Sequence, residues 1–314
     1  GIVLALFGFV HSFYSSVRVL GDAGSALNIT ALIGVANQLD PNVLKLAFIF
    51  VLVGYGTKVG PVPMHTWLPD AYSEAPAPIA AMLAGVLETV AVYTVLRSKA
   101  LVDQALPPEF TGNLLLTFGL LSFIVASLFI LIQHNYKRLF AYSSIEHMGL
   151  AMIGFGVGGM VGTFGGLFHL LNHAVAKALA FFVAGNIHRR FDTLEIDGVR
   201  GVARAQPITA VAILVAGCAL VGLPPFSPFV SELLIVSAVA AQDFASDTMH
   251  VGRFVTMTIS DEMRSLGIVA LFLLFAVVLF GGFMFRIGAM VWGTPPAGIA
   301  QGESWTVGHV PLMI

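Results

Sequence analysis

Three ionisable side chains, His169, His173 and Lys177, follow one another at helical spacing in an apolar segment. The segment covers residues 165–185, which is long enough to cross a bilayer as a helix. At about 100° per residue, positions i, i+4 and i+8 lie within one stripe of that helix. A histidine or lysine in hydrocarbon costs several kcal/mol unless it faces protein or water. The spacing therefore predicts a path for protons through the membrane rather than an ordinary apolar core.

Further ionisable residues fall at membrane depth, and they are Lys58, Glu88, Glu146, His147 and Glu232. Burial disfavours the charged forms of lysine and of carboxylic acids, so that both can exchange a proton near neutral pH. Histidine exchanges protons there without help from burial. Lysine, histidine and glutamate with water between them predict a proton relay. A metal site is the less favoured interpretation, since the pair His169 and His173 has no third ligand at a suitable spacing.

The segment from His65 to Asp70 follows a proline-rich break and carries two ionisable side chains. Either His65 or Asp70 could gate access from the aqueous side. The alternative is a plain re-entry turn, in which Asp70 caps the next piece of helix. Further along, Lys137 and Arg138 lie at the end of an apolar span, where we expect a pair that faces solvent or lipid headgroups.

The composition is that of a membrane protein. Hydrophobic residues make up 57% of the 314 and charged residues only 10%, whereas soluble domains typically carry about 25% charged residues. The formal net charge of −2 gives no reason to expect a nucleic-acid partner. Because Cys218 is the only cysteine, this chain alone does not supply the thiolates of an iron–sulfur cluster. We therefore expect no cofactor in this chain and place any redox chemistry on other subunits.

Apolar runs and polar breaks predict an all-α polytopic membrane protein with about eight transmembrane helices. The expected segments are 1–20, 43–60, 78–97, 112–132, 139–158, 162–187, 207–240 and 266–286. Prolines interrupt two of them, near 58–63 and 222–228. Interrupted helices are tolerated in hydrocarbon only where they are buried or line a cavity, and in transporters with internal repeats they mark ion sites. Lys58 precedes the first break and Glu232 follows the second.

Four motifs occur in the order of a known family, and they are Gly56–Asp70, Tyr136–Ser144, His169–Lys177 and Leu223–Glu232. Together they cover nearly the whole chain. The sequence resembles the antiporter-like proton-translocating subunits of respiratory complex I, Mrp-type sodium/proton antiporters and membrane-bound nickel–iron hydrogenases of group 4. Residues 68–78 and 141–149 look most like the membrane subunit of hydrogenase-4 or formate hydrogenlyase.

This resemblance implies one transmembrane domain over residues 1–314, part of an inverted-repeat 14-helix antiporter-like fold. Residues 1–110 would form the end of the first repeat, residues 111–286 the second repeat, and residues 287–314 a truncated C-terminal segment. We expect the chain to be a fragment that lacks the N-terminal helices of that fold, including the helix whose glutamate pairs with the equivalent of Lys58.

The resemblance also implies roles for single residues. Lys58 matches the central lysine of the first half-channel, and Lys177, with His169 and His173, matches the connecting and central groups of the second. Glu232 lies where the family places an exit lysine or glutamate. The chain departs from the family on the eighth helix, where Thr89 aligns near the usual lysine and Glu88 lies beside it. The link between half-channels would run through Glu88, or be weakened.

The leading functional hypothesis is a proton-translocating subunit of a redox-driven complex in a bacterial or archaeal plasma membrane. Its expected partners are other membrane subunits and a peripheral hydrogenase or iron–sulfur arm, so that the chain would be part of an oxidoreductase without holding a redox centre. One alternative is a sodium/proton antiporter module or a complex I subunit. Another is a membrane anchor that does not pump, which the threonine at position 89 favours.

Overall fold

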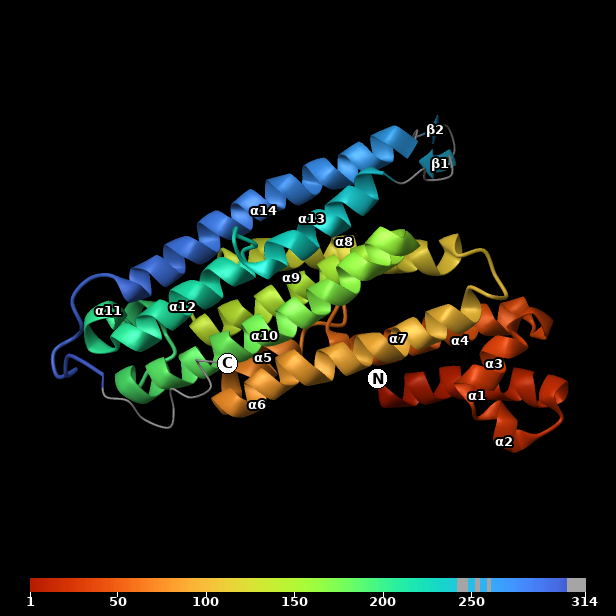
Figure 1. The fold of residues 1–314 in the computed structure, drawn as a ribbon, viewed down its shortest axis with the longest axis horizontal. Helices are drawn as coiled ribbons and strands as arrows, with labels where there is room; N and C mark the ends of the chain where they lie inside the picture. The colour runs from red at the N-terminus through yellow and green to blue at the C-terminus, as the bar shows by residue number, and fades with distance from the viewer. Residues whose placement is uncertain (242–247, 252–254, 259–260, 304–314) are drawn as a thin grey trace.

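The computed structural model describes residues 1–241, 248–251, 255–258 and 261–303. The helices are α1 (Ile2–Leu20), α2 (Ala23–Ala26), α3 (Ile29–Gly34), α4 (Pro41–Val59), α5 (Leu68–Glu74), α6 (Ala77–Met82), α7 (Glu88–Val102), α8 (Glu109–Ile130), α9 (Tyr136–Val157), α10 (Gly159–Phe191), α11 (Val202–Ala205), α12 (Pro207–Leu220), α13 (Ser227–Ala240) and α14 (Asp261–Val291). Two short strands, β1 (Thr248–Val251) and β2 (Val255–Thr258), pair in antiparallel fashion between α13 and α14. Figure 1 shows the long helices lying side by side, with α14 along one edge of the molecule and α1 at the opposite edge.

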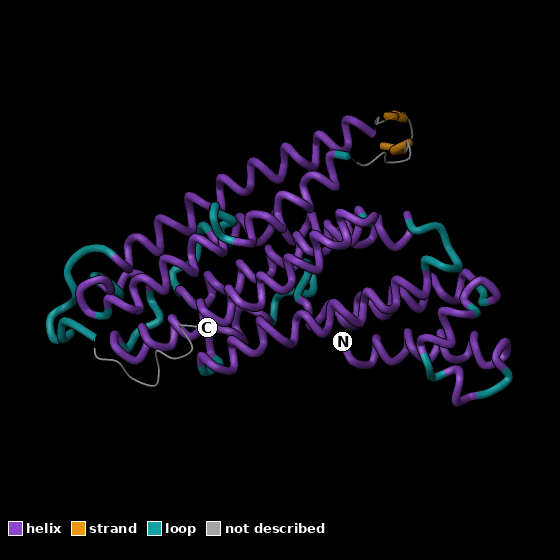
Figure 2. The backbone as a smooth tube through the Cα atoms, in the orientation of Figure 1, coloured by secondary structure: helices purple, strands orange, loops and turns teal. Residues whose placement is uncertain are grey.

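The helices account for all eight expected membrane segments. Six are long and apolar enough to cross a membrane, and they are α1, α4, the continuous stretch Ala77–Val102, α8, α10 and Met263–Val291. The expected segment 139–158 lies in α9, a 22-residue helix that carries several ionisable side chains. The expected segment 207–240 forms α12 and α13, two apolar helices of 14 residues each. The chain is a helical multi-pass membrane protein. The small hairpin of β1 and β2 (Figure 2) and the short helices α2, α3 and α11 lie outside the expected segments.

Both predicted helix breaks are present, and they share a local design. In the first broken helix, α4 ends at Val59. Gly60 follows with φ 83°, and a cis bond joins Val62 to Pro63. In the second broken helix, α12 ends at Leu220. Gly222 has φ 62°, and a cis bond joins Pro224 to Pro225. A positive φ suits glycine, and proline has no N–H with which to continue a helix. The chain then resumes as α5 and α13 respectively.

Helix α9 is the centre of the described bundle. Nearly all of its residues are buried, and it packs along α8 on one side and α10 on the other. Glycines allow the close approach to α8, since a Cβ atom built on Gly149 would lie 2.8 Å from the carbonyl oxygen of Gly119. Side chains that point inward from α9 are therefore held away from lipid.

The turn between α6 and α7 is wider than an α-helical turn. Residues Leu83–Leu87 form a π-helical segment, which contains an extra residue and changes the direction of the side chains that follow it. Glu88 comes directly after this segment and is fully buried. Thr89 is only half-buried, and its hydroxyl donates a hydrogen bond to the Gly85 carbonyl of its own helix. The acidic residue, not the threonine, therefore faces the interior.

Candidate functional site

The structure brings most of the predicted relay residues into one buried cluster. Its members are Glu88 of α7, Glu146 and His147 of α9, His169, His173 and Lys177 of α10, and Glu232 of α13. All but Glu232 are at most 3% exposed, and Glu232 is half-buried. Ionisable groups that are buried in a membrane bundle face protein or cavities because exposure to hydrocarbon is costly. We call these seven residues the polar cluster.

Lys177 lies at the centre of the bundle. Its side chain is fully buried, and its Nζ donates a 2.7 Å hydrogen bond to the carbonyl oxygen of Phe140 on α9. Glu88 and Glu146 are near enough to interact with it electrostatically. The ammonium group therefore has one direct acceptor and two nearby carboxylates.

Glu88 joins the first broken helix to α10. The hydroxyl of Tyr72, on α5, donates a 2.5 Å hydrogen bond to its Oε1. Its Oε2 lies 3.2 Å from Nε2 of His173. The Glu88 carboxylate thus contacts both Tyr72 of α5 and His173 of α10. The family resemblance led us to expect a linking group at this position.

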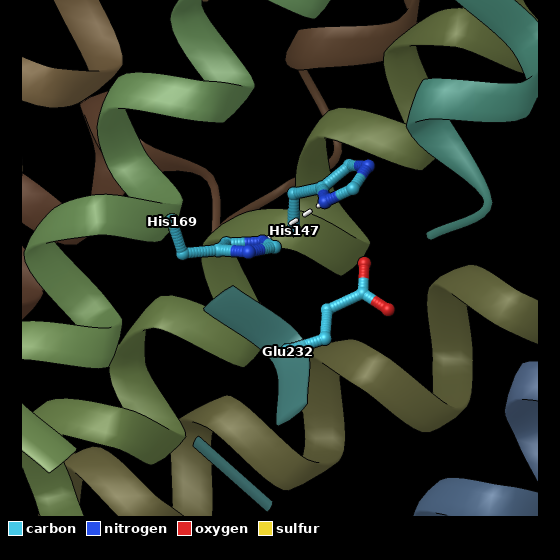
Figure 3. A group of neighbouring side chains, drawn as sticks. All are labelled: His147, His169 and Glu232. Atoms are coloured by element: carbon cyan, nitrogen blue, oxygen red, sulfur yellow. Dashed lines mark hydrogen bonds between the residues drawn. The ribbon is translucent and has the colours of Figure 1, made fainter. Parts of the chain in front are cut away.

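Two histidines from different helices contact each other directly. Nδ1 of His147 lies 2.9 Å from Nε2 of His169, as Figure 3 shows by a dashed line. The other nitrogen of His169 lies 3.0 Å from the hydroxyl of Ser231 on α13. The ring of His147 is also near His173, with 5.3 Å between centroids, and its Nε2 lies 3.6 Å from a carboxylate oxygen of Glu146. His147 therefore stands between the two halves of the polar cluster.

Glu232 belongs to the second broken helix, and its carboxylate lies against the break. A Cβ atom built on Gly222 would be 2.1 Å from Oε2 of Glu232. Figure 3 shows the side chains of His147, His169 and Glu232 converging from three elements. The break therefore leaves room for the carboxylate that follows it.

Three predicted site residues lie outside the polar cluster. Lys58 is half-buried near the end of α4 and lines an open pocket of about 480 Å³ with residues of α1. It makes no hydrogen bond or ion pair with another described residue. Asp70 is exposed and pairs with Arg138, while His65 is half-buried, with its ring 6.5 Å from the ring of Tyr142. The structure does not join these residues to the others by direct contact.

The expectation that Lys137 faces solvent or headgroups is wrong. Lys137 is 4% exposed, and its Nζ donates hydrogen bonds to the carbonyls of Ser73 and Ala75, at 3.2 and 2.9 Å. These carbonyls lie at the C-terminal end of α5, where backbone oxygens lack helical partners and a cation is favourable. Arg138, its neighbour, does face outward and pairs with Asp70. Lys137 thus stabilises the end of the short helix that carries Tyr72.

Sequence reasoning did not assign a site role to Tyr72, Asn172 or Ser231. The amide of Asn172 donates to Ser231 Oγ and to the Ser227 carbonyl, both at 3.1 Å. Asn172 lies three residues after His169, and Ser231 directly precedes Glu232. Their closeness in sequence to predicted site residues is the feature from which a site role could have been predicted.

Comparison with known proteins shows the family. The family model described as "NADH:quinone oxidoreductase/Mrp antiporter, TM" matches residues 2–260. This chain belongs to that family. The family resemblance predicted from the four motifs is therefore confirmed.

Two curated relatives illustrate its range. The chain is 40% identical over 242 residues to a hydrogenase-4 component F homolog of Methylacidiphilum infernorum, covering 77% of this chain and 51% of that protein. It is 36% identical over 254 residues to NAD(P)H-quinone oxidoreductase chain 4 2 of Thermosynechococcus vestitus, covering 79% of this chain and 46% of that protein. The chain spans about half the length of these relatives.

Solved structures show the antiporter-like fold. A chain of the membrane-bound sulfane sulfur reductase, an archaeal respiratory membrane complex, matches with a TM-score of 0.80 and 27% identity, over 99% of this chain and 59% of that chain. A chain of the Mrp complex of a Dietzia species matches in fold, with a TM-score of 0.76 and 21% identity, over 98% of this chain and 54% of that chain. Respiratory complex I of Thermus thermophilus matches with a TM-score of 0.65 and 26% identity, over 93% of this chain and 58% of that chain.

Proposed function

We propose that this protein is an antiporter-like proton-translocating subunit of a redox-driven membrane complex, of the hydrogenase-4 or formate hydrogenlyase type. The observation that supports this best is the polar cluster, which extends from the first broken helix to the second. At one end of the cluster, Glu88 accepts a hydrogen bond from Tyr72 of the first broken helix, and at the other end Glu232 belongs to the second.

Most contacts along this series are short enough for a proton to pass through a hydrogen bond. Glu88 and His173 are 3.2 Å apart, and His147 and His169 are 2.9 Å apart. Between them lies the gap from His173 to His147, where the ring centroids are 5.3 Å apart. Rotation of one ring or one bridging water closes a gap of this size. One local movement therefore makes the series continuous from Glu88 to His169, and the Glu232 carboxylate lies beyond it, with an oxygen within 4.8 Å of a nitrogen of each of His147 and His169.

Lys177 is suited to control this series by its charge. The ammonium group interacts electrostatically with Glu88, at one end of the series, and with Glu146, which lies beside His147 in the middle of it. Each unit charge moved across 100 mV costs about 2.3 kcal/mol, so a redox reaction must supply the work. In this proposal, a change of charge on a partner subunit alters the protonation of Lys177, and the neighbouring carboxylates respond.

The identity of the complex is the finer part of the proposal. The motifs at residues 68–78 and 141–149 and the 40% identity to a hydrogenase-4 component F homolog favour the hydrogenase branch. Other membrane subunits and a peripheral hydrogenase or iron–sulfur arm are the proposed partners. Electron transfer would take place on them, with the bacterial or archaeal plasma membrane as the site of coupling.

The test uses the full-length protein in its complex, reconstituted into liposomes. Redox-driven acidification is followed with and without sodium for the wild type, for Lys177→Ala, and for Lys45→Ala, a control lysine outside the polar cluster. We expect sodium-independent acidification that Lys177→Ala abolishes and Lys45→Ala leaves unchanged. Pumping that requires sodium would indicate an antiporter module instead. Absence of pumping in the wild type would indicate a membrane anchor.

A further inference from the structure

We propose that His147, His169 and Glu232 form a binding site for a divalent transition metal ion of the Zn²⁺ class. The consequence for transport, a reversible block between the two histidines, rests on the proposed function. The binding of the metal does not. Spacing along the chain offers His169 and His173 no third ligand, whereas the fold brings His147 and Glu232 next to His169.

The three side chains come from three helices and converge on one point. One ligand atom from each lies within 4.8 Å of the other two (Figure 3). Zn²⁺ holds nitrogen and carboxylate ligands at about 2.0–2.2 Å in tetrahedral geometry, so its ligand atoms are about 3.4 Å apart. The two imidazoles, now at 2.9 Å, open by about half an ångström, and the Glu232 carboxylate, which has an oxygen within 4.8 Å of a nitrogen of each ring, moves inward. Both movements lie within the range of a side-chain adjustment.

Hydrogen bonds around Ser231 define which nitrogen of His169 is free to bind a metal. The Ser231 hydroxyl donates to the Pro228 carbonyl at 2.8 Å and accepts from Asn172 at 3.1 Å. Since its single hydrogen is used, the 3.0 Å contact with His169 requires Nδ1 of His169 to be the donor. Nε2 of His169 then carries a bare lone pair directed at His147. A metal-binding histidine is usually oriented in this way, by a hydrogen bond from its other nitrogen.

The two tautomers of His147 leave different nitrogens without a hydrogen-bond partner. If Nδ1 of His147 carries the proton, its Nε2 is a bare nitrogen that makes no hydrogen bond with the described residues, on a side chain that is 1% exposed. If Nε2 carries the proton, two bare nitrogens face each other at 2.9 Å. In the second case Nε2 points to Glu146, whose carboxylate oxygen is 3.6 Å away and can accept its proton. In this second tautomer, a metal ion between the rings binds both facing lone pairs.

The chemistry of these ligands selects the class of ion. Two imidazoles and one carboxylate suit Zn²⁺ or Co²⁺, whereas Mg²⁺ and Ca²⁺ prefer sites made of oxygen atoms. Three protein ligands leave a fourth position for water. Because the metal would occupy the nitrogens that pass the proton from His147 to His169, binding and proton transfer exclude each other.

Direct binding is tested on the full-length protein in its complex after treatment with a chelator. Titration with Co²⁺ should give the intense visible absorption of a tetrahedral ion, and Zn²⁺ should displace it. X-ray absorption at the zinc edge should show about two imidazole ligands. We expect His169→Gln and Glu232→Gln to weaken binding by more than about tenfold, and the control His173→Gln to retain it. Unchanged binding in His169→Gln would overturn the site.

A second measurement covers the case in which those variants do not fold. A zinc spectrum of the wild type that contains only oxygen ligands, or no tight binding at all, also overturns the site. In liposomes, we expect Zn²⁺ to stop redox-driven acidification and EDTA to restore it. Metal binding with histidine ligands but without any wild-type acidification would leave the site standing and refute the proposed function. Redox-driven acidification without a histidine-ligated metal would refute the metal site and leave the proposed function standing.

Discussion

Replacing Gly222 with alanine would place a methyl group where the carboxylate of Glu232 now lies. The added Cβ atom would be 2.1 Å from Oε2 and 2.7 Å from Cδ, whereas ordinary contacts begin at 3.4 Å. The carboxylate must therefore move by more than an ångström. In addition, Gly222 has φ 62°, a conformation that costs a residue with a Cβ atom about 1–2 kcal/mol.

These two effects have different consequences. The unfavourable φ of alanine at position 222 lowers the free energy of unfolding by about 1–2 kcal/mol. Displacing a reacting group by about 1 Å can lower a rate about a hundredfold, and we expect a fall of that order in proton flux. Gly21 provides a matched control, since its φ is 69° and a Cβ atom there would meet nothing within 4 Å. Gly21→Ala should lose similar stability and keep its transport.

The assay compares both variants in the same complex. Titration with SDS measures the free energy of unfolding, and acidification of liposomes measures proton flux. A proton flux that stays at the wild-type level in both variants would show that the position of the Glu232 carboxylate does not matter, and the assignment of Glu232 to the relay would be wrong. A flux that falls equally in both would attribute the effect to backbone strain alone.

Other substitutions test the remaining contacts. Glu88→Gln should abolish acidification of liposomes because an amide does not exchange a proton. The control Thr89→Ala, at the next and half-buried position, should preserve acidification. Equal proton flux in the two variants would exclude Glu88 from the path. Lys137→Met should lower the free energy of unfolding by about 2–3 kcal/mol, since it removes a charged donor from two backbone carbonyls. Arg138→Met removes only an exposed pair with Asp70 and should cost less than about 1 kcal/mol in the same SDS titration; a similar loss in both variants would contradict the structural role of Lys137.

Patterns within one segment were sufficient to predict the helices and their breaks. The i, i+4, i+8 spacing of His169, His173 and Lys177 indicated a single face, and all three side chains are buried. Prolines indicated the interruptions after α4 and α12, since they remove the hydrogen bonds that a helix needs. Such features depend on residues near one another in sequence.

Contacts between distant segments were not predictable in this way. The hydrogen bond from Tyr72 to Glu88 depends on the path of the chain between α5 and α7, and the bonds of Lys137 join residues more than 60 positions apart. The Lys137 ammonium group can bind either solvent or the carbonyls at the end of α5. Sequence alone does not show that these carbonyls lie within hydrogen-bond distance of Lys137. Roles assigned to Lys58, His65 and Asp70 remain predictions that depend on parts of the assembly beyond these contacts.

The π-helical turn at Leu83–Leu87 affects how this helix should be compared with its relatives. Such a turn holds one residue more than an α-helical turn, and each residue of an α-helix accounts for about 100° of rotation. In an alignment with a relative whose helix is α-helical throughout, a gap belongs in this turn. Without that gap, the positions after the turn are offset by one, so that Leu87 is matched to the counterpart of Glu88 and Glu88 to the counterpart of Thr89. Residue numbering, rather than a change in chemistry, then accounts for an apparent loss of the buried ionisable group.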